Sequence, residues 1–498
     1  MSQVDLLEQG LSEALCLVRS TKNTFAPINK IPPEVFSLIA HQCDKEEDFI
    51  SLTHVCQKWR QIAISCPSLW TNLDCEDINK TCAYLKRSKA SPLKINLENG
   101  YFLDDAFRLT IPHFGRLKNL SLFVDSEKFL ELTKHLRSPA PFIKTLSLDV
   151  IDPMEFVLTD AIFGGDLSSL HKLTLDGVIT NLAWENMSNL RKLYLRNIPS
   201  NKISMTRLLD FFERAPLLCE IKLRDALPNS SDAPLERVVP LPNLKSLAIH
   251  ARQPHTILMN HLSIPAGALT SQGFFFGGTD SPIPFHLPET LENLKNISSI
   301  TSIDLDLNSG VHLRLRGPSG GLIMHCKWAS VTAIPIDKVY RVLRSLHLFR
   351  MSKVERLAIS RWPYRPRQET IESSLFQSFL LIGNLRTLAL NNWANLPFIT
   401  ALNPQKNAPR VLIFPKLEEL SMYIKETDCF YGEELLDMAE ERTSRGAKLK
   451  AVVIVGPREH APAKEMSKLR VYVSHVEYRS DAPAWDTIPD DTGYDSDD

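Results

Sequence analysis

The stretch "LRKLYLRNIPSNKISMTRLLDFFERAPLLCEIKL", residues 190–223, holds one complete structural unit of this chain. Its two ends, "LRKLYL" and "LCEIKL", alternate apolar and polar residues, which predicts short strands with leucines on one face. Between them "MTRLLDFFERAP", residues 205–216, has apolar residues at helical spacing and predicts a return helix. One strand and one helix bury little surface alone, so the unit predicts a stack of similar neighbours.

The same apolar-x-x-apolar-x-apolar pattern recurs eleven times along the chain. Its copies begin at Leu117, Ile143, Leu170, Leu190, Leu218, Leu244, Ile300, Val354, Leu385, Leu417 and Leu449. Most intervals lie between 20 and 32 residues, and the two long ones, of 56 and 54, each predict a degenerate hidden repeat. "FQSFLLIGN", residues 376–384, predicts a second return helix. The pattern indicates a solenoid of parallel strands with helical returns.

Residues 300–328 depart from this pattern. "IDLDLNSGVHLRLRGPSGGLIMHCKW", residues 303–328, alternates over three stretches joined by "NSG" and "GPSGG". Such spacing predicts an antiparallel meander that interrupts the solenoid.

Composition narrows the classes of function. The 498 residues carry a net charge of −1, so no overall field attracts nucleic acid, and no apolar run is long enough to cross a membrane. No secretory signal precedes the nine scattered cysteines, so we expect reduced thiols in the cytoplasm or nucleus.

Catalytic and cofactor motifs are missing. Cys43, Cys56, Cys66, Cys75 and Cys82 lack the close pairing that zinc sites need, and Cys56 is expected on the apolar face of a helix. "GFFFGG", residues 273–278, lacks the lysine and hydroxyl residue of a phosphate-binding loop. We therefore expect no cofactor, no metal and no enzyme activity.

The N-terminus predicts helices. Val4, Leu7, Leu11, Leu15 and Val18 form the apolar stripe of an amphipathic helix within residues 1–26, packed either on its neighbour or on a partner helix.

A small helical module is predicted at residues 27–75. Pro32 and Pro33 suit a helix start, and Asp44 with Glu47 has capping-box spacing before a second helix. Pro67 ends that second helix. Its predicted apolar face consists of Phe49, Leu52, Val55, Cys56, Trp59, Ile62 and Ala63.

This module resembles an F-box. The resemblance lies in Pro32, Pro33 and Glu34, then Leu52, Val55, Cys56, Trp59 and Arg60, then Pro67, Leu69 and Trp70; Ile31 and Gln57 depart mildly from the pattern. It implies docking on the Skp-type adaptor of a cullin-RING ubiquitin ligase. The positions it would assign to adaptor binding are Pro32, Pro33, Val35, Leu52, Val55 and Trp59. Alternatively, Trp59 and Trp70 do not dock on a partner but pack against the domain that follows. We expect this packing for Trp70.

The repeats resemble leucine-rich repeats of the long, helix-returning kind, although the asparagine after each strand survives clearly only as Asn197. The expected fold is therefore α/β: a small all-α F-box, then an irregular leucine-rich-repeat-like solenoid interrupted by the meander. The predicted boundaries are 1–26 for the first helix, 27–75 for the F-box, 76–476 for the solenoid and 477–498 for a disordered acidic tail. The combination resembles the expanded F-box families of mushroom-forming fungi.

Two segments offer binding surfaces. Lys192, Tyr194, Arg196, Lys222 and Arg224 would form a basic patch on the open face of adjacent strands, either a solvated surface or part of a substrate groove. The acidic tail, which has seven aspartates after position 480, is either solubilising or a kinase target at Ser496. The chain as a whole predicts a non-catalytic adaptor that binds Skp, through it cullin, and an unidentified substrate protein; the alternative is an interaction scaffold outside ubiquitin transfer.

Overall fold

A computed structural model describes most of the chain. The described residues are 3–43, 45–98, 103–151, 157–158, 162–180, 187–228, 237–251, 256–276, 291–306, 310–328, 349, 351–361, 379–391, 394–407, 410–424, 431–457 and 463–480. The chain divides into two compact units, residues 1–190 and 191–498.

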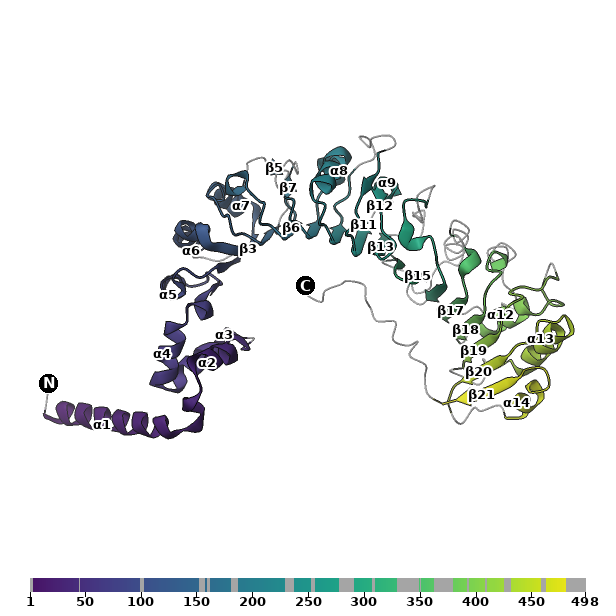
Figure 1. Ribbon diagram of the computed structural model, residues 1–498, viewed down its shortest axis with the longest axis horizontal. Coiled ribbons are helices and arrows are strands. Elements are labelled where there is room, and N and C mark those ends of the chain that lie inside the picture. The colour runs from purple at the N-terminus through teal and green to yellow at the C-terminus, as the bar shows by residue number, and fades with distance from the viewer. Residues whose placement is uncertain are drawn as a thin grey trace. The chain divides into compact units, whose positions relative to one another are not determined.

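The first unit begins with helices (Figure 1). The long helix α1 (Gln3–Phe25) leads through the short helix η1 (Pro27–Lys30) into the helical module. The module contains α2 (Pro33–His41), α3 (Glu46–Val55), α4 (Gln57–Ser65) and η2 (Pro67–Trp70). The predicted start at Pro32 and Pro33 is confirmed, because Pro32 is the N-cap of α2 and Pro33 its first residue.

The module has its own aromatic core. The rings of Phe36 in α2 and Trp59 in α4 meet edge to face, with centroids 5.1 Å apart. Phe49 in α3 meets Trp70 in the same manner, also at 5.1 Å. Such edge-to-face pairs bury large apolar surfaces with a favourable ring geometry.

The single second helix predicted from Phe49 to Ala63 is wrong, because the chain breaks at Cys56. This residue is extended, with φ −157° and ψ 165°, and separates α3 from α4. Its Sγ accepts a hydrogen bond from the backbone N–H of Trp59 at 3.5 Å, so the thiol caps α4. The apolar spacing runs through the break, which is why the pattern read as one helix. Asp44 of the proposed capping box lies outside the described residues, and Lys45 is the N-cap of α3.

Parallel strands follow in the first unit. β1 (Asn72–Leu73), β2 (Leu93–Glu98), β3 (Leu117–Val124), β4 (Thr145–Val150) and β6 (Lys172–Asp176) pair in that order. The segments between them include α5 (Ile78–Ser88), α6 (Leu103–Thr110), η3 (Ile111–Arg116), α7 (Ser126–Thr133) and η4 (Ile162–Gly165). A second, two-stranded sheet joins β5 (Val157–Leu158) to β7 (Ile179–Thr180).

The second unit begins with a similar series. β8 (Lys192–Arg196), β9 (Glu220–Arg224), β11 (Ser246–Ala251) and β13 (Leu269–Phe276) pair in parallel. Between them lie η5 (Ser200–Lys202), α8 (Met205–Arg214), α9 (Thr256–Asn260), and the paired short strands β10 (Val239–Pro240) and β12 (Leu262–Ser263). α8 confirms the return helix predicted at 205–216.

The predicted meander is confirmed. β14 (Ser302–Asp306), β15 (Gly310–Arg316) and β16 (Gly321–Trp328) pair antiparallel in turn. β16 also pairs in parallel with β13, and β14 pairs in parallel with β17 (Arg356–Arg361). Thus the spatial order is β13, β16, β15, β14, β17.

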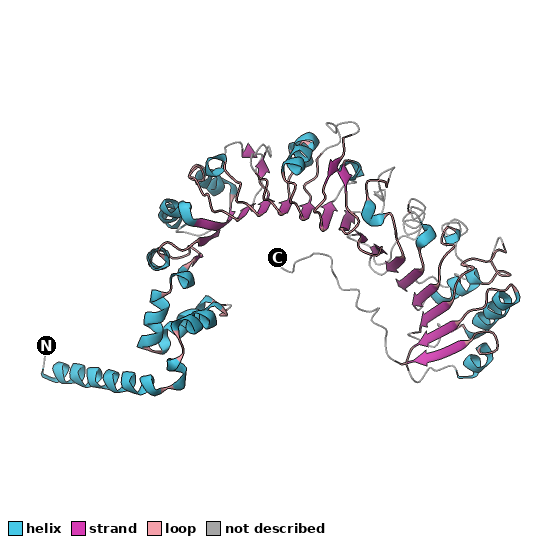
Figure 2. Ribbon diagram, viewed as in Figure 1, coloured by secondary structure: helices cyan, strands magenta, loops and turns pink. Residues whose placement is uncertain are grey.

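Four further parallel strands complete the described part of this unit. β18 (Thr387–Asn391), β19 (Glu419–Tyr423), β20 (Ala451–Val455) and β21 (His475–Arg479) extend the sheet from β17. The connecting segments include η7 (Lys295–Ile297), η9 (Met351–Lys353), α12 (Asn395–Leu402), α13 (Gly432–Ser444) and α14 (Ala463–Leu469). Figure 2 shows α12, α13 and α14 along one side of strands β18 to β21.

The pattern leucines form the core of both units. Leu146 and Leu148 in β4, like Leu193 and Leu195 in β8, are fully buried. Ser147, between the first pair, is half-buried, whereas Tyr194, between the second pair, is only 8% exposed. Each of the eleven predicted repeats contains a described strand, and the first long interval hides β13. The structure therefore shows a large, mostly parallel sheet with helices.

Left-handed residues end two of these strands. Asn197 follows β8 with φ 51°, and Asp225 follows β9 with φ 47°. The N–H of Asn197 donates to the carbonyl of Arg224 at 2.9 Å, and the N–H of Asp225 to that of His250 at 2.8 Å. Asn and Asp tolerate this conformation better than most residues, so Asp225 takes the place that asparagine has after β8.

Two predictions fall wholly or partly outside the described residues. The acidic tail after Ser480 is one, and the return helix at 376–384 is the other, with only Phe379 and Leu380 described as helical.

Candidate docking surfaces

Helix α2 is apolar on more than one face. Phe36 and Ala40 point into the core, while Val35, Leu38 and Ile39 are 41%, 65% and 42% exposed. At 100° per residue, Leu38 lies opposite the midpoint of Phe36 and Ala40. The small module can bury only one face of this nine-residue helix, so the opposite face stays in water.

The two prolines that precede this surface are also exposed. Pro32 and Pro33 both lie at the start of α2, beside Val35. Neither is enclosed by the chain's own described residues, so the surface predicted for adaptor binding is accessible at this end.

Helix α3 has a similar division. Phe49 and Thr53 are buried, Leu52 is half-buried, and Val55 is 58% exposed at the end of the helix. Val55 also lines a hollow of about 380 Å³ between the start of α4 and residues Cys16 to Thr24 of α1.

Trp59 differs from the other residues proposed for docking. Its side chain is only 9% exposed and packs on Phe36, so it lies beneath the surface rather than on it. The structure thus places Pro32, Pro33, Val35 and Val55 in water, Leu52 at the margin and Trp59 in the core. Contact with an adaptor stays a prediction for all six.

The comparison with protein families bears on this module. Residues 28–76 match the F-box-like family model. The match coincides with the helical module and ends just after β1. No curated protein matches the chain. The exposed apolar residues therefore belong to an F-box-like domain, in a class of proteins that are generally non-catalytic adaptors.

Trp70 joins the F-box-like domain to the strands that follow it. Its ring lies 5.0 Å from that of Tyr84 in α5, and the Arg87 guanidinium lies 4.3 Å from the Trp70 ring centroid. The indole N–H donates to the Ala63 carbonyl at 2.7 Å. This confirms that Trp70 packs against the following domain.

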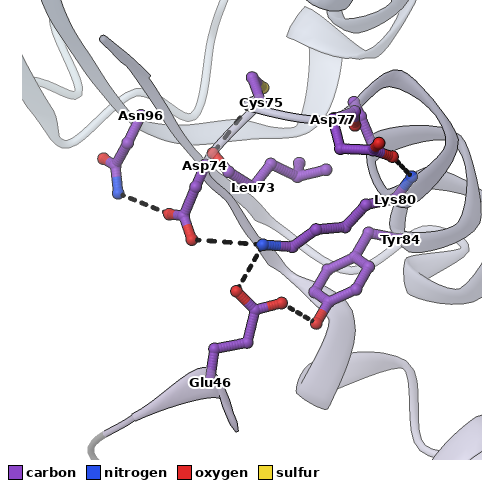
Figure 3. A network of polar contacts seen from close by, with 9 residues as sticks. Glu46, Leu73, Asp74, Cys75, Asp77, Lys80, Tyr84 and Asn96 are labelled. Atoms are coloured by element: carbon purple, nitrogen blue, oxygen red, sulfur yellow. Dashed lines mark hydrogen bonds and ion pairs between the residues drawn. The ribbon is translucent and has the colours of Figure 1, made fainter. Parts of the chain in front are cut away.

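A polar network reinforces the same junction (Figure 3). Lys80 Nζ in α5 lies 2.6 Å from Glu46 Oε2 in α3 and 4.0 Å from Asp74 Oδ2. The Tyr84 hydroxyl donates to the other oxygen of Glu46. Asp77 caps α5 by accepting from the N–H of Lys80 at 2.6 Å.

The network shifts the pKa values of its members. Burial by itself would raise the pKa of Glu46, but hydrogen bonds from Lys80 and Tyr84 outweigh it and hold that pKa below its usual value. Burial and the hydrogen bond to Glu46 both raise the pKa of Tyr84. Glu46 is therefore a carboxylate that fastens α3 to α5.

The predicted basic patch is brought together on β8 and β9. In the parallel register Tyr194 stands opposite Lys222, and Arg196 opposite Arg224. Lys222 Nζ lies 4.9 Å from the centroid of the Tyr194 ring, a cation–π distance.

One carboxylate, which the prediction of a basic patch left out, lies inside it. Glu220 Oε2 lies 2.7 Å from Lys192 Nζ, and Glu220 Oε1 accepts from the Tyr194 hydroxyl at 2.6 Å. Burial would raise the pKa of Glu220, but the hydrogen bonds from Lys192 and Tyr194 lower it overall. Glu220 thus neutralises part of the positive charge of the patch. The register of β8 and β9, which sets Glu220 opposite Lys192, was the signal that could have predicted this pairing.

His250 extends the patch onto β11. It is the register partner of Arg224, and burial, followed by the charges of Arg224 and Lys222, lowers its pKa. Sequence reasoning missed it because a lone histidine in a strand carries no pattern. Leu38 and Ile39 were missed as well, although the nearly all-apolar "VFSLIA" already indicated a helix with more apolar surface than its module could bury.

Within the described residues no cluster of three histidine, cysteine or acidic side chains is placed to hold a metal ion. Burial raises the pKa of the Cys75 thiol to about 12, which makes it a poor ligand and nucleophile. None of the described helices has the length and apolar character needed to cross a membrane. "GFFFGG" begins inside strand β13 rather than in a loop, and Gly277 and Gly278 lie outside the described residues.

Proposed function

We propose that this protein is a substrate-recognition subunit of a Skp–cullin–F-box ubiquitin ligase. The F-box-like domain would bind a Skp-type adaptor, and the leucine-rich-repeat-like sheet would bind a substrate protein. Such a subunit works by bringing substrate lysines close to a ubiquitin-charged enzyme, without chemistry of its own. The cytoplasm or the nucleus, where such ligases act, is the proposed location.

The observation that carries the proposal is the exposed apolar surface of the F-box-like domain. Val35, Leu38 and Val55 remain in water although the domain has a complete aromatic core beneath them. Apolar side chains that a folded domain leaves exposed together are typical of a protein interface. Burying one of them in a partner contributes on the order of 1.5–3 kcal/mol.

The surface positions allow a direct test. Val35→Glu and Val55→Glu would place charges on the proposed interface without entering the core. Asn79→Glu adds the same charge at an exposed position of α5, outside the family match, and serves as the control. The full chain would be isolated from cells that contain a tagged Skp-type adaptor and cullin.

We expect both proteins to co-purify with the unaltered chain and with Asn79→Glu, and a loss of at least about tenfold for either valine variant. Failure of the adaptor to co-purify with the unaltered chain would refute the proposal. Adaptor without cullin would favour an interaction scaffold outside ubiquitin transfer.

The substrate surface is proposed on the open face of β8, β9 and β11. Its support is a cationic and aromatic cluster, although Glu220 compensates part of the charge. The Arg196→Glu/Arg224→Glu variant should lose substrate proteins and retain the adaptor. Lys464→Glu/Lys468→Glu, on exposed positions of α14, reverses the same number of charges elsewhere and is the control. Unchanged recovery of all bound proteins would remove this surface from consideration.

A further inference from the structure

Helix α1 carries an apolar stripe that the described residues of its own chain leave exposed. None of its 23 residues is buried. Val4, Leu7, Leu11, Leu15, Val18 and Phe25 are between 50% and 74% exposed. Figure 1 shows the N-terminal half of α1 projecting beyond helices α2 to α4.

The spacing of the stripe is that of a coiled coil. Val4, Leu7, Leu11, Ala14 and Val18 follow one another at alternating steps of three and four residues, and Phe25 continues the series one heptad after Val18. Such a series repeats every 3.5 residues on average, so it keeps one seam facing a partner helix over three heptads. Leu15, adjacent to this seam, widens it.

The other side of α1 is the one that faces the F-box-like domain. Cys16, Arg19, Ser20 and Asn23 line the hollow against Val55 to Lys58. At 100° per residue these four positions centre about 150° from the midline of the apolar seam. With this side turned to its own domain, α1 presents the seam outward.

Charge along α1 indicates what covers the seam. Asp5, Glu8 and Glu13 lie in its first half, whereas Arg19 and Lys22 lie in its second half. In an antiparallel pair of identical helices, each acidic half lies along the basic half of the other copy. Glu8 and Lys22 both flank the seam at the same heptad position, two heptads apart, so an antiparallel pair centred near Leu15 sets each Glu8 against Lys22 of the other copy.

We infer that α1 is a self-association helix, which joins two copies of this chain through an antiparallel coiled coil. A parallel pair would bring Glu8 of one copy to the level of Glu8 of the other and would leave Lys22 without an opposite charge. The antiparallel pair instead withdraws twelve exposed apolar side chains from water, six from each copy, and matches two ion pairs.

The association state of the full chain is the first test. Sedimentation over roughly 1 to 100 µM should show a species of twice 56.4 kDa that dissociates on dilution. Leu11→Glu puts a charge in the seam and should leave only monomer. Ser12→Glu puts the same charge at an exposed position about 120° from the midline of the seam and should leave the dimer unchanged. A monomer at every concentration, or a dimer that survives Leu11→Glu, would overturn the inference.

A charge exchange tests the antiparallel arrangement. Glu8→Lys and Lys22→Glu should each weaken the dimer by roughly tenfold, because each opposes like charges at two symmetric contacts. The double variant Glu8→Lys/Lys22→Glu should restore it, since both contacts regain opposite charges. A double variant no better than the single ones would refute the antiparallel pair. None of these measurements requires a Skp-type adaptor, so failure here and failure of the proposed function are separate outcomes.

Discussion

Replacement of Trp70 by alanine should uncouple the F-box-like domain from the strands that follow. The indole is 1% exposed and contacts Phe49 of the domain and Tyr84 of α5. Its N–H also satisfies the buried carbonyl of Ala63. The side chain thus belongs to two cores at once.

The size of the effect follows from these contacts. Removing a buried tryptophan in favour of alanine costs about 3–5 kcal/mol, from lost transfer free energy and from the cavity that remains. Trp70→Phe keeps a ring between Phe49 and Tyr84 and loses chiefly the hydrogen bond to Ala63. A single lost hydrogen bond of that kind costs about 1–2 kcal/mol.

Amide hydrogen exchange on the full chain can resolve the two variants. Peptides from α3, α4 and α5 should lose about 3–5 kcal/mol of opening free energy in Trp70→Ala and about 1–2 kcal/mol in Trp70→Phe. Peptides from β18 to β21, in the second unit, should keep their protection in both. Equal protection in the two variants, or equal loss throughout the chain, would refute the assignment of Trp70 as the link.

Three further perturbations have defined outcomes. The pKa of Glu46 is lowered in the folded state, so its contribution to stability is present above pH 4.5 and is lost as the pH falls through the pKa of the folded state. In urea unfolding, the stability of Glu46→Gln should therefore depend less on acid pH than that of the unaltered chain. Arg442 is fully buried and donates to the carbonyls of Ile413 and Phe414 at 2.9 Å each, so Arg442→Leu should lower the unfolding free energy by about 2–4 kcal/mol, and a loss below about 1 kcal/mol would contradict the role of those bonds. A Cβ on Gly321 would lie 2.3 Å from the Leu315 carbonyl, whereas one on Gly267 would meet nothing within 4 Å; thermal unfolding should therefore show Gly321→Ala destabilised and Gly267→Ala nearly unchanged.

Repetition made the strands predictable. Alternating leucines at eleven places predicted which residues face the core. Alternating apolar and polar residues, joined by glycine-containing turns, predicted the meander. Both signals are local, and both recur or extend over many residues, so neighbouring copies support one another.

Details that depend on the third dimension were not predictable. The break at Cys56 does not disturb the apolar spacing, and the burial of Trp59 depends on which of two apolar faces the neighbouring helix covers. Glu220 was recognisable as an open-face residue, but its two partners became evident only from the strand register. The spacing of apolar residues predicts on which side of a helix or strand a residue lies. Whether that residue is buried and which partners it contacts depend on the elements packed against it.

The strand order of the meander has a consequence for the growing polypeptide. Strands β9 and β11 each pair with the strand made just before them, and β13 likewise joins β11. The next place in the sheet is different, since Leu269 of β13 pairs with Gly321 on β16, which emerges from the ribosome 52 residues later. Elongation of the sheet must therefore wait at β13 until the whole meander has been translated, and a nascent chain stalled before Gly321 would present β13 as an open edge to chaperones or to other chains.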